Sequence, residues 1–454
     1  MTTLWFETAL LPQGWAKAVR IAIGEDGRIA SVDADTPYQE VDERHWAAMP
    51  GVPNLHSHAF QRAMAGLTER RGSTRDSFWT WRDLMYRFAA RIDPDLLEAV
   101  AAMAFVEMLE SGFTRTGEFH YVHHQPSGSA YDDVGAMAAS LASAADLTGI
   151  GLTVLPVFYA ASGFGGQAPT TGQRRFLSSV DGFAKLLDAT ETAVATLPDA
   201  IIGIAPHSLR AVPPDALQAL AQMRPNAPFH LHIAEQVREV EDCVAWSGRR
   251  PVEWLFDTFA VDARWCLVHA THVSAAEVEA IVASRAVVGL CPVTEANLGD
   301  GIFPANAFAA QGGRYGVGSD SNVAIDAGGE LRMLEYGQRL VSRERNVLAA
   351  SSRSSGRAMI DAAIAGGAQA LGMPVAGLVA GTSADLVSFD GEHPSLAGRN
   401  GDAILDSWVF AAGQGAIDCV WRRGQRLVSE GRHFAREQVA QRYKHALGLL
   451  LDGQ

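Results

Sequence analysis

The feature that most restricts the fold of this chain is a regular alternation between short apolar runs and longer stretches with helical spacing. One apolar run leads into His56, and others follow at 113–119, 151–159, 200–206, 229–235, 265–270, 286–291 and 315–320. Stretches rich in Ala, Leu and Glu lie between them, for example at 95–111, 130–147, 177–196 and 214–223. Buried parallel strands read as continuous apolar runs, so the pattern predicts a parallel α/β core. Eight such units favour a closed (β/α)8 TIM-like barrel over an open doubly wound sheet.

The two ends of the chain have a different pattern, which is typical of antiparallel strands. Residues 19–33 form two alternating runs around Asp26-Gly27, a strong hairpin signal. Residues 382–390 and 416–429 also read as strands. We therefore expect a small β-sandwich domain from residues 1–48 and 379–435, a barrel over 49–378 and a C-terminal helix over 436–454.

Charge and hydropathy exclude several classes of protein. The 454 residues carry a net charge of −14, which argues against a nucleic-acid partner because phosphate binding needs a basic surface. An anionic substrate would need local arginines to overcome this field. No apolar run reaches membrane-spanning length and the start of the chain lacks a secretory pattern, so we expect a cytoplasmic protein without a membrane partner.

Polar residues that bind metals occur where the predicted strands end. His56 and His58 end the first strand, and side chains two apart on a strand face the same side. His232 ends the fifth strand, His269 the sixth and Asp320 the eighth. The carboxyl ends of barrel strands meet at one face, where active sites are found. Imidazoles and a carboxylate gathered there favour a divalent transition metal with one coordination position open for water.

Two details of this constellation depend on neighbouring residues. Glu235 follows His232 by three residues and lies just beyond the strand, within reach of the same water. His230 shares a strand face with His232, so spacing alone does not choose between them, and we prefer His232 because it is nearer the end of the strand. A single histidine of this kind is more often structural; the ordered set at strand ends favours a metal site.

Several longer strings resemble a known family. The segments PGVPNLHSH at 50–58, HIAE at 232–235 and GSDS at 318–321, together with His269, resemble the deaminase branch of the amidohydrolase superfamily. Within that branch the chain is similar to the formimidoylglutamate deiminases. This similarity is carried by FWTWRDLMYRF at 78–88, FHYVHH at 119–124, APHSLRAV at 205–212, CPVTEANLGDGIFP at 291–304 and SDSNVAIDAGGELRMLEYGQRL at 319–340.

The resemblance implies a role for each matching residue. The metal ligands match His56, His58, His232 and Asp320, the proton-carrying acid matches Glu235, and a neighbouring histidine matches His269. Substrate contacts match Gln61, Arg82, Tyr121, His207 and Arg210. The fourth apolar run has no Lys, which in the superfamily bridges two metals, so one divalent ion is expected, either Zn²⁺, which we prefer, or Fe²⁺.

The reaction implied is hydrolysis of N-formimino-L-glutamate, a small acidic substrate of histidine degradation, to N-formyl-L-glutamate and ammonia. We also expect a homodimer, because dimers are common among soluble enzymes. In this scheme Asp320 takes the proton of the attacking water, Glu235 donates to the imino nitrogen and His269 orients the water. One alternative is a deaminase of a purine, pyrimidine or triazine ring, for which Arg82 and Arg210 are unfavourable. Another is a non-catalytic scaffold, which typically lacks the metal ligands.

Overall fold

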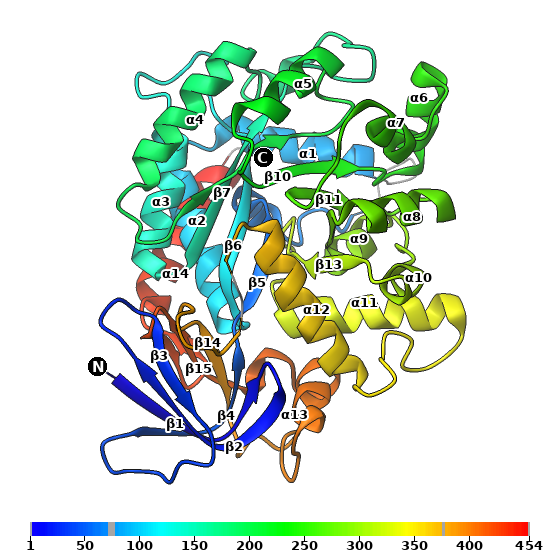
Figure 1. Cartoon of the computed structure of the whole chain (residues 1–454). Coiled ribbons are helices and arrows are strands. Elements are labelled where there is room, and N and C mark those ends of the chain that lie inside the picture. Colours follow the sequence, from blue (N-terminus) through cyan, green and yellow to red (C-terminus); the bar gives the residue numbers. More distant parts are fainter. Residues whose placement is uncertain (1, 71–77, 375–376, 453–454) are drawn as a thin grey trace.

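The computed structural model describes residues 2–70, 78–374 and 377–452, and its centre is a parallel barrel (Figure 1). The barrel strands are β5 (Val52–Ser57), β6 (Phe113–His120), β7 (Gly151–Phe158), β8 (Ile201–Ile202), β9 (Ala205–Pro206), β10 (Phe229–Ile233), β11 (Trp265–His269), β12 (Val287–Leu290) and β13 (Arg314–Val317). They form two parallel sheets, β5 to β9 and β10 to β13. Parallel bridges between Ile204 and Phe229 and between Ser57 and Asp320 join the two sheets into a ring. The predicted barrel is confirmed.

The fourth position of the barrel differs from the expected single strand, because two short segments, β8 and β9, occupy it. Both pair with β7, and Gly203 lies between them. A Cβ atom at Gly203 would lie 2.4 Å from Leu155 Cδ2 and 2.8 Å from the Pro228 carbonyl oxygen. The two neighbouring strands therefore approach so closely here that only glycine fits.

Helices surround the barrel. They are α1 (Phe78–Arg91), α2 (Pro94–Glu110), α3 (Ala136–Thr148), α4 (Val180–Val194), α5 (Pro214–Met223), α6 (Val237–Ser247), α7 (Pro251–Thr258), α8 (Ala275–Ser284), α9 (Pro292–Leu298), α10 (Ala305–Ala310), α11 (Ala327–Ser342) and α12 (Ser355–Ala370). Among them, α1 and α9 also line the mouth of the barrel. The start of α2 shows why these boundaries form: the Asp93 side chain accepts from the Leu96 amide and Pro94 occupies the first helical position. Among the described residues, no helix combines the length and apolar character needed to cross a membrane.

The small domain is built from both ends of the chain, as predicted, and lies at the base of the barrel (Figure 1). Its eight strands follow the order β17-β16-β15-β14-β4-β1-β2-β3. Their bounds are β1 (Thr2–Leu11), β2 (Gly14–Ile23), β3 (Ile29–Asp33), β4 (Glu43–Pro50), β14 (Leu386–Phe389), β15 (Ile417–Arg422), β16 (Gln425–Ser429) and β17 (Arg432–His433). Phe6, Ile21, Leu386 and Trp421 share one core, so strands from both ends enclose the same apolar interior. The hairpin at Asp26-Gly27 joins β2 to β3.

Charged groups hold the two domains and the C-terminal helix together. Arg115 of β6 and Arg422 of β15 both bind the Asp199 carboxylate, which precedes β8. The last helix, α14 (Arg436–Leu451), packs on α2, where Arg436 pairs with Glu110 at 2.9 Å. These contacts lie away from the carboxyl ends of the barrel strands and leave that face to the site.

Candidate active site

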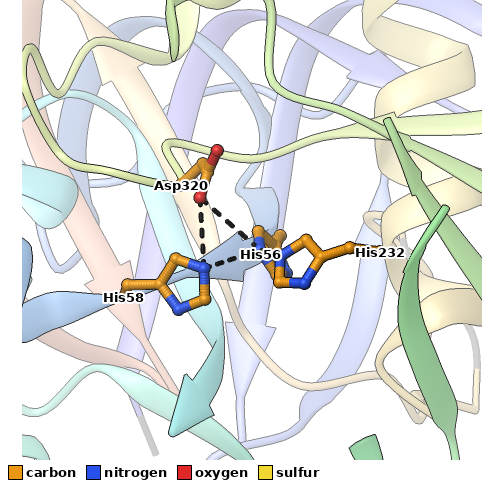
Figure 2. A group of neighbouring side chains, drawn as sticks. All are labelled: His56, His58, His232 and Asp320. Atoms are coloured by element: carbon orange, nitrogen blue, oxygen red, sulfur yellow. Dashed lines mark hydrogen bonds and ion pairs between the residues drawn. The ribbon is translucent and has the colours of Figure 1, made fainter. Parts of the chain in front are cut away.

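Three imidazoles and one carboxylate meet at the carboxyl ends of the barrel strands (Figure 2). His56 and His58 come from the end of β5, His232 from β10, and Asp320 follows β13. Nε2 of His56 lies 3.2 Å from Nε2 of His58 and 3.1 Å from Nε2 of His232. Asp320 Oδ1 lies 3.3 Å from His58 Nε2 and 3.6 Å from His56 Nε2. Ligand atoms about 2.1 Å from a tetrahedral ion are separated from one another by roughly 3.4 Å, so this spacing suits a metal.

The hydrogen bonds of the rings leave their inward nitrogens free to bind a cation. Nδ1 of His58 donates to the Phe119 carbonyl at 2.8 Å, and Nδ1 of His232 donates to the His207 carbonyl at 3.0 Å. The rings of His58 and His232 therefore carry a lone pair, and no proton, at Nε2. A proton on His56 Nε2 could form a hydrogen bond to only one of these two nitrogens. Burial lowers the pKa of His56 to about 3 and also lowers those of His58 and His232, so all three rings are neutral. Converging neutral lone pairs beside a carboxylate fit a divalent transition-metal ion.

The structure separates His232 from His230, which spacing could not do. His230 is also buried inside the barrel, but its Nε2 donates to the Ala370 carbonyl at 2.7 Å. It lies one pleat deeper on β10 and is not among the four clustered residues. The geometry therefore favours His232 as the ligand.

A network of small polar side chains, which the sequence did not reveal, holds the Asp320 turn. Asp320 has a left-handed backbone with φ 45°, and its amide donates to the His56 carbonyl at 3.0 Å. The Asn322 side chain donates to the carbonyl oxygens of Asp320 and His58 at 3.1 and 3.0 Å. Asn54 on β5 accepts from the Ser319 amide at 3.0 Å. These bonds tie the end of β13 to β5 and bring the carboxylate and two imidazoles to one point.

His269 lies between the acid and the aspartate. Its Nε2 is 3.9 Å from Glu235 Oε1 and 3.8 Å from Asp320 Oδ2, while its Nδ1 lies 3.2 Å from Glu295 Oε1. Burial opposes a charge on the ring, but the carboxylates of Glu235, Glu295 and Asp320 outweigh it and raise the pKa of His269 to about 10. Burial also raises the pKa of Glu235, as a proton donor requires. Glu295, on α9, was missed because it acts through His269 and follows no strand pattern.

A cleft adjoins this cluster and is lined by every predicted site residue except His56, which lies deeper. Gln61 is on the 3-10 helix η1 (Ala59–Met64), Arg82 is on α1, Tyr121 follows β6, and His207 and Arg210 follow β9. The Gln61 amide donates to the Tyr121 hydroxyl at 2.8 Å. Within the described part of the chain, Gln61 Oε1, Arg82 Nε and Arg210 Nε are buried without a hydrogen-bond partner. These groups are available to a polar ligand.

The two arginines of the cleft lie against Trp79 of α1. The guanidinium carbon of Arg82 is 4.6 Å from the centre of the Trp79 ring, and that of Arg210 is 5.7 Å from it. Arg82 forms no ion pair with any described residue, and the described carboxylate that pairs with Arg210 is Glu239, at 3.9 Å. An aromatic platform with incompletely neutralised guanidinium groups suits a carboxylate ligand.

Comparison with known proteins agrees with this geometry. Residues 47–427 match the family model described as the amidohydrolase family, and residues 1–46 match that of the formimidoylglutamate deiminase HutF N-terminal domain. The chain is 50% identical to a formimidoylglutamate deiminase from Pseudomonas aeruginosa over 100% of both chains. A crystal structure of an amidohydrolase from Brucella melitensis has a TM-score of 0.97 and 52% identity, covering 99% of this chain and 100% of that one. An adenosine deaminase from Xanthomonas campestris, solved with bound zinc, shares the fold at a TM-score of 0.83 and 21% identity, over 99% and 98% of the two chains.

Proposed function

The chain belongs to the amidohydrolase family, and we propose that it is a metal-dependent deiminase that hydrolyses N-formimino-L-glutamate to N-formyl-L-glutamate and ammonia. The observation that carries this proposal is that Arg82 and Arg210 line the same cleft as the three histidines and Asp320. The substrate has one amidine carbon to be attacked and two carboxylates to be held, and the cleft offers groups for both tasks. The full-length similarity to the Pseudomonas aeruginosa formimidoylglutamate deiminase supports the same substrate.

We assign one divalent ion to His56, His58, His232 and Asp320, with zinc preferred and iron compatible with the same donors. A single ion is supported by the lysines: Lys17 is on β2, Lys185 on α4 and Lys444 on α14, so the fourth strand offers none to bridge two metals. When bound, the ion supplies a water of lowered pKa and thus a nucleophile at neutral pH.

The residues around that water divide the proton transfers between them. Asp320 accepts a proton from the attacking water through its carboxylate. His269, held by Glu295, orients the water and stabilises the charge that develops on the oxygen. The amidine is a strong base and binds in its protonated form, so addition of the water oxygen to its carbon leaves a terminal –NH2 group. Glu235 donates a proton to this nitrogen, the C–N bond breaks with loss of ammonia and not of an amide anion, and the hydroxyl proton of the collapsing carbon returns to Glu235. Loss of the other nitrogen would give formamide and glutamate.

Recognition of the substrate is assigned to the remaining cleft residues. Arg82 and Arg210 hold the carboxylates, while Gln61 and Tyr121 form a hydrogen-bonded pair that contacts the substrate between its charged ends. His207, whose carbonyl orients His232, presents its ring to the same cleft. A flat heterocycle would bring no carboxylate to either guanidinium group, so a ring deaminase is the weaker interpretation.

The decisive experiment measures ammonia release from N-formimino-L-glutamate, guanine and cytosine, with the products separated by chromatography. We expect ammonia and N-formyl-L-glutamate from the first substrate and turnover of neither ring. Ammonia from a ring alone, or formamide and glutamate as products, would overturn the proposal. Loss of activity on chelation and its return with Zn²⁺ tests the metal. The homodimer and the cytoplasmic location remain predictions, which light scattering and cell fractionation measure.

A further inference from the structure

A fully buried carboxylate, Glu239, lies just outside the cleft between two of its functional groups. Glu239 is in the first turn of α6, and none of its surface is exposed. One oxygen accepts from the Ala234 amide at 3.2 Å and the other from the Glu235 amide at 3.1 Å. The second oxygen also lies 3.9 Å from Nε of Arg210. One side chain thus contacts the backbone of the proposed acid and faces the side chain of a proposed carboxylate anchor.

The backbone at this point is strained, and two of its amides donate to the Glu239 carboxylate. Ala234 has φ 51°, a left-handed conformation that is unfavourable for a residue with a Cβ. Successive amides on such a turn point in one direction and form a small anion-binding concavity. Glu239 fills it from within the same chain, and charged acceptors make stronger hydrogen bonds than neutral ones. The direction in which Glu235 leaves the end of β10 therefore depends on Glu239.

The contact with Arg210 is incomplete, and its geometry explains why the arginine can still bind a ligand. Both oxygens of Glu239 are already used by amides, and a separation of 3.9 Å is too long for a hydrogen bond. The attraction between the charges holds the guanidinium group without occupying its donors. Arg210 Nε remains without a hydrogen-bond partner among the described residues, although Arg210 is only 7% exposed.

We propose that Glu239 is a positioning residue that fixes the acid Glu235 and the anchor Arg210 relative to each other. This inference rests on the proposed function, because it assigns Arg210 to a substrate carboxylate. Loss of the Glu239 charge should act on both groups: the acid leaves its position, which lowers kcat for every amidine, and the anchor loosens, which raises KM only for substrates with a carboxylate.

Two amidines separate these effects, namely N-formimino-L-glutamate and N-ethylformamidine, which has no carboxylate. For Glu239→Gln we expect kcat to fall on the order of tenfold to a hundredfold with both, since a charged hydrogen bond is replaced by a mismatched amide. We expect KM to rise about tenfold for N-formimino-L-glutamate and to stay unchanged for N-ethylformamidine. A residue that only supports the fold would not produce this selective change in KM.

The chain offers a matched control two positions further along the same helix. Glu241 is exposed, and its side chain has no hydrogen bond or ion pair with any described residue, so Glu241→Gln removes the same charge without changing the contacts of Glu235 or Arg210. We expect its kcat and KM to equal those of the parent. Glu239→Asp retains the charge on a shorter side chain, and we expect its kcat to lie between those of the parent and Glu239→Gln.

The outcomes of this experiment are distinct. If Glu239→Gln matches Glu241→Gln, or if its KM rises equally for both amidines, Glu239 does not link the two groups. If both Glu239 variants fail to fold or lose the bound metal, the residue is structural and the inference is wrong. If the parent itself does not release ammonia from N-formimino-L-glutamate, the proposed function is wrong. That result is distinct from one in which only the positioning role of Glu239 is wrong.

Discussion

The metal end of the cleft and its recognition wall are built in different ways. We use metal end for His56, His58, His232 and Asp320, and recognition wall for Gln61, Arg82, Tyr121, His207 and Arg210. At the metal end, two rings have their outer nitrogens bonded to backbone carbonyls, and Asp320 is tied by its own amide to β5. On the recognition wall, several buried polar atoms have no partner among the described residues. Two of the three metal-end rings are thus fixed by the backbone, with Nδ1 of His56 unpartnered among the described residues, whereas the wall presents its unpartnered groups to a ligand.

This difference follows from the elements that carry the residues. The metal end uses the ends of barrel strands, whose backbone is held by neighbouring strands on both sides. The recognition wall uses η1, α1 and the segments after β6 and β9. Gln61 and Arg82 lie on helices outside the strand ladder, whereas the His207 backbone still bonds to Phe158 and His232. The barrel thus fixes the chemistry, and the connecting segments set the substrate. Changes at the metal end should affect every amidine, and changes on the wall only those with matching polar groups.

The largest effect should come from breaking the metal end. We expect His232→Ala to lose bound metal and at least about a thousandfold in kcat/KM, because the nucleophile depends on the ion. His230→Ala is the matched control, since it removes a buried histidine one pleat away whose Nε2 bonds to the Ala370 carbonyl. It should retain metal and most activity. Elemental analysis with the ammonia assay measures both, and metal loss in His230→Ala alone would reverse the assignment.

The next largest effect tests whether Glu235 donates a proton without being needed to bind the metal. We expect Glu235→Gln to bind metal as the parent does and to lose about a hundredfold to ten-thousandfold in kcat, since an amide cannot deliver a proton. KM should change little, because Glu235 is not assigned to hold the substrate. Glu279→Gln, on the exposed side of α8, removes the same charge as a control. Turnover of Glu235→Gln near that of Glu279→Gln would remove the proposed role.

A smaller effect, confined to acidic substrates, should come from the wall. We expect Arg210→Ala to raise KM for N-formimino-L-glutamate on the order of tenfold to a hundredfold, the contribution of a charge-assisted hydrogen bond. KM for N-ethylformamidine and the metal content should not change. Arg249→Ala is the control, because Arg249 is exposed and pairs only with exposed Asp257 among the described residues. Equal increases in KM for both amidines would argue against carboxylate anchoring.

The same difference between the two regions explains what the sequence could predict. Strand parity and the common face of barrel strand ends were sufficient to bring His56, His58 and Asp320 together. Parity could not separate His232 from His230, because only their depth in the barrel differs. Glu239 and Glu295 escaped prediction for another reason: each acts through a backbone amide or a ring of another residue, and such contacts leave no periodic pattern in the sequence. The positions of Arg82 and Gln61 followed from resemblance, since no strand pattern governs η1 or α1.

The smallest predicted effect comes from removing one neutral hydrogen bond of the recognition wall. It tests whether this bond affects substrate binding without affecting the metal end. Tyr121→Phe removes the hydroxyl that accepts from the Gln61 amide at 2.8 Å. A neutral bond contributes modestly, so we expect KM for N-formimino-L-glutamate to rise about twofold to tenfold with kcat and metal content unchanged. Tyr38→Phe, on the exposed surface of the small domain, is the control. The Tyr121 ring also lies 5.2 Å from the His58 ring. A fall in kcat alone would therefore mean that the hydroxyl positions the metal end through His58, and the two regions would no longer be separable at this contact.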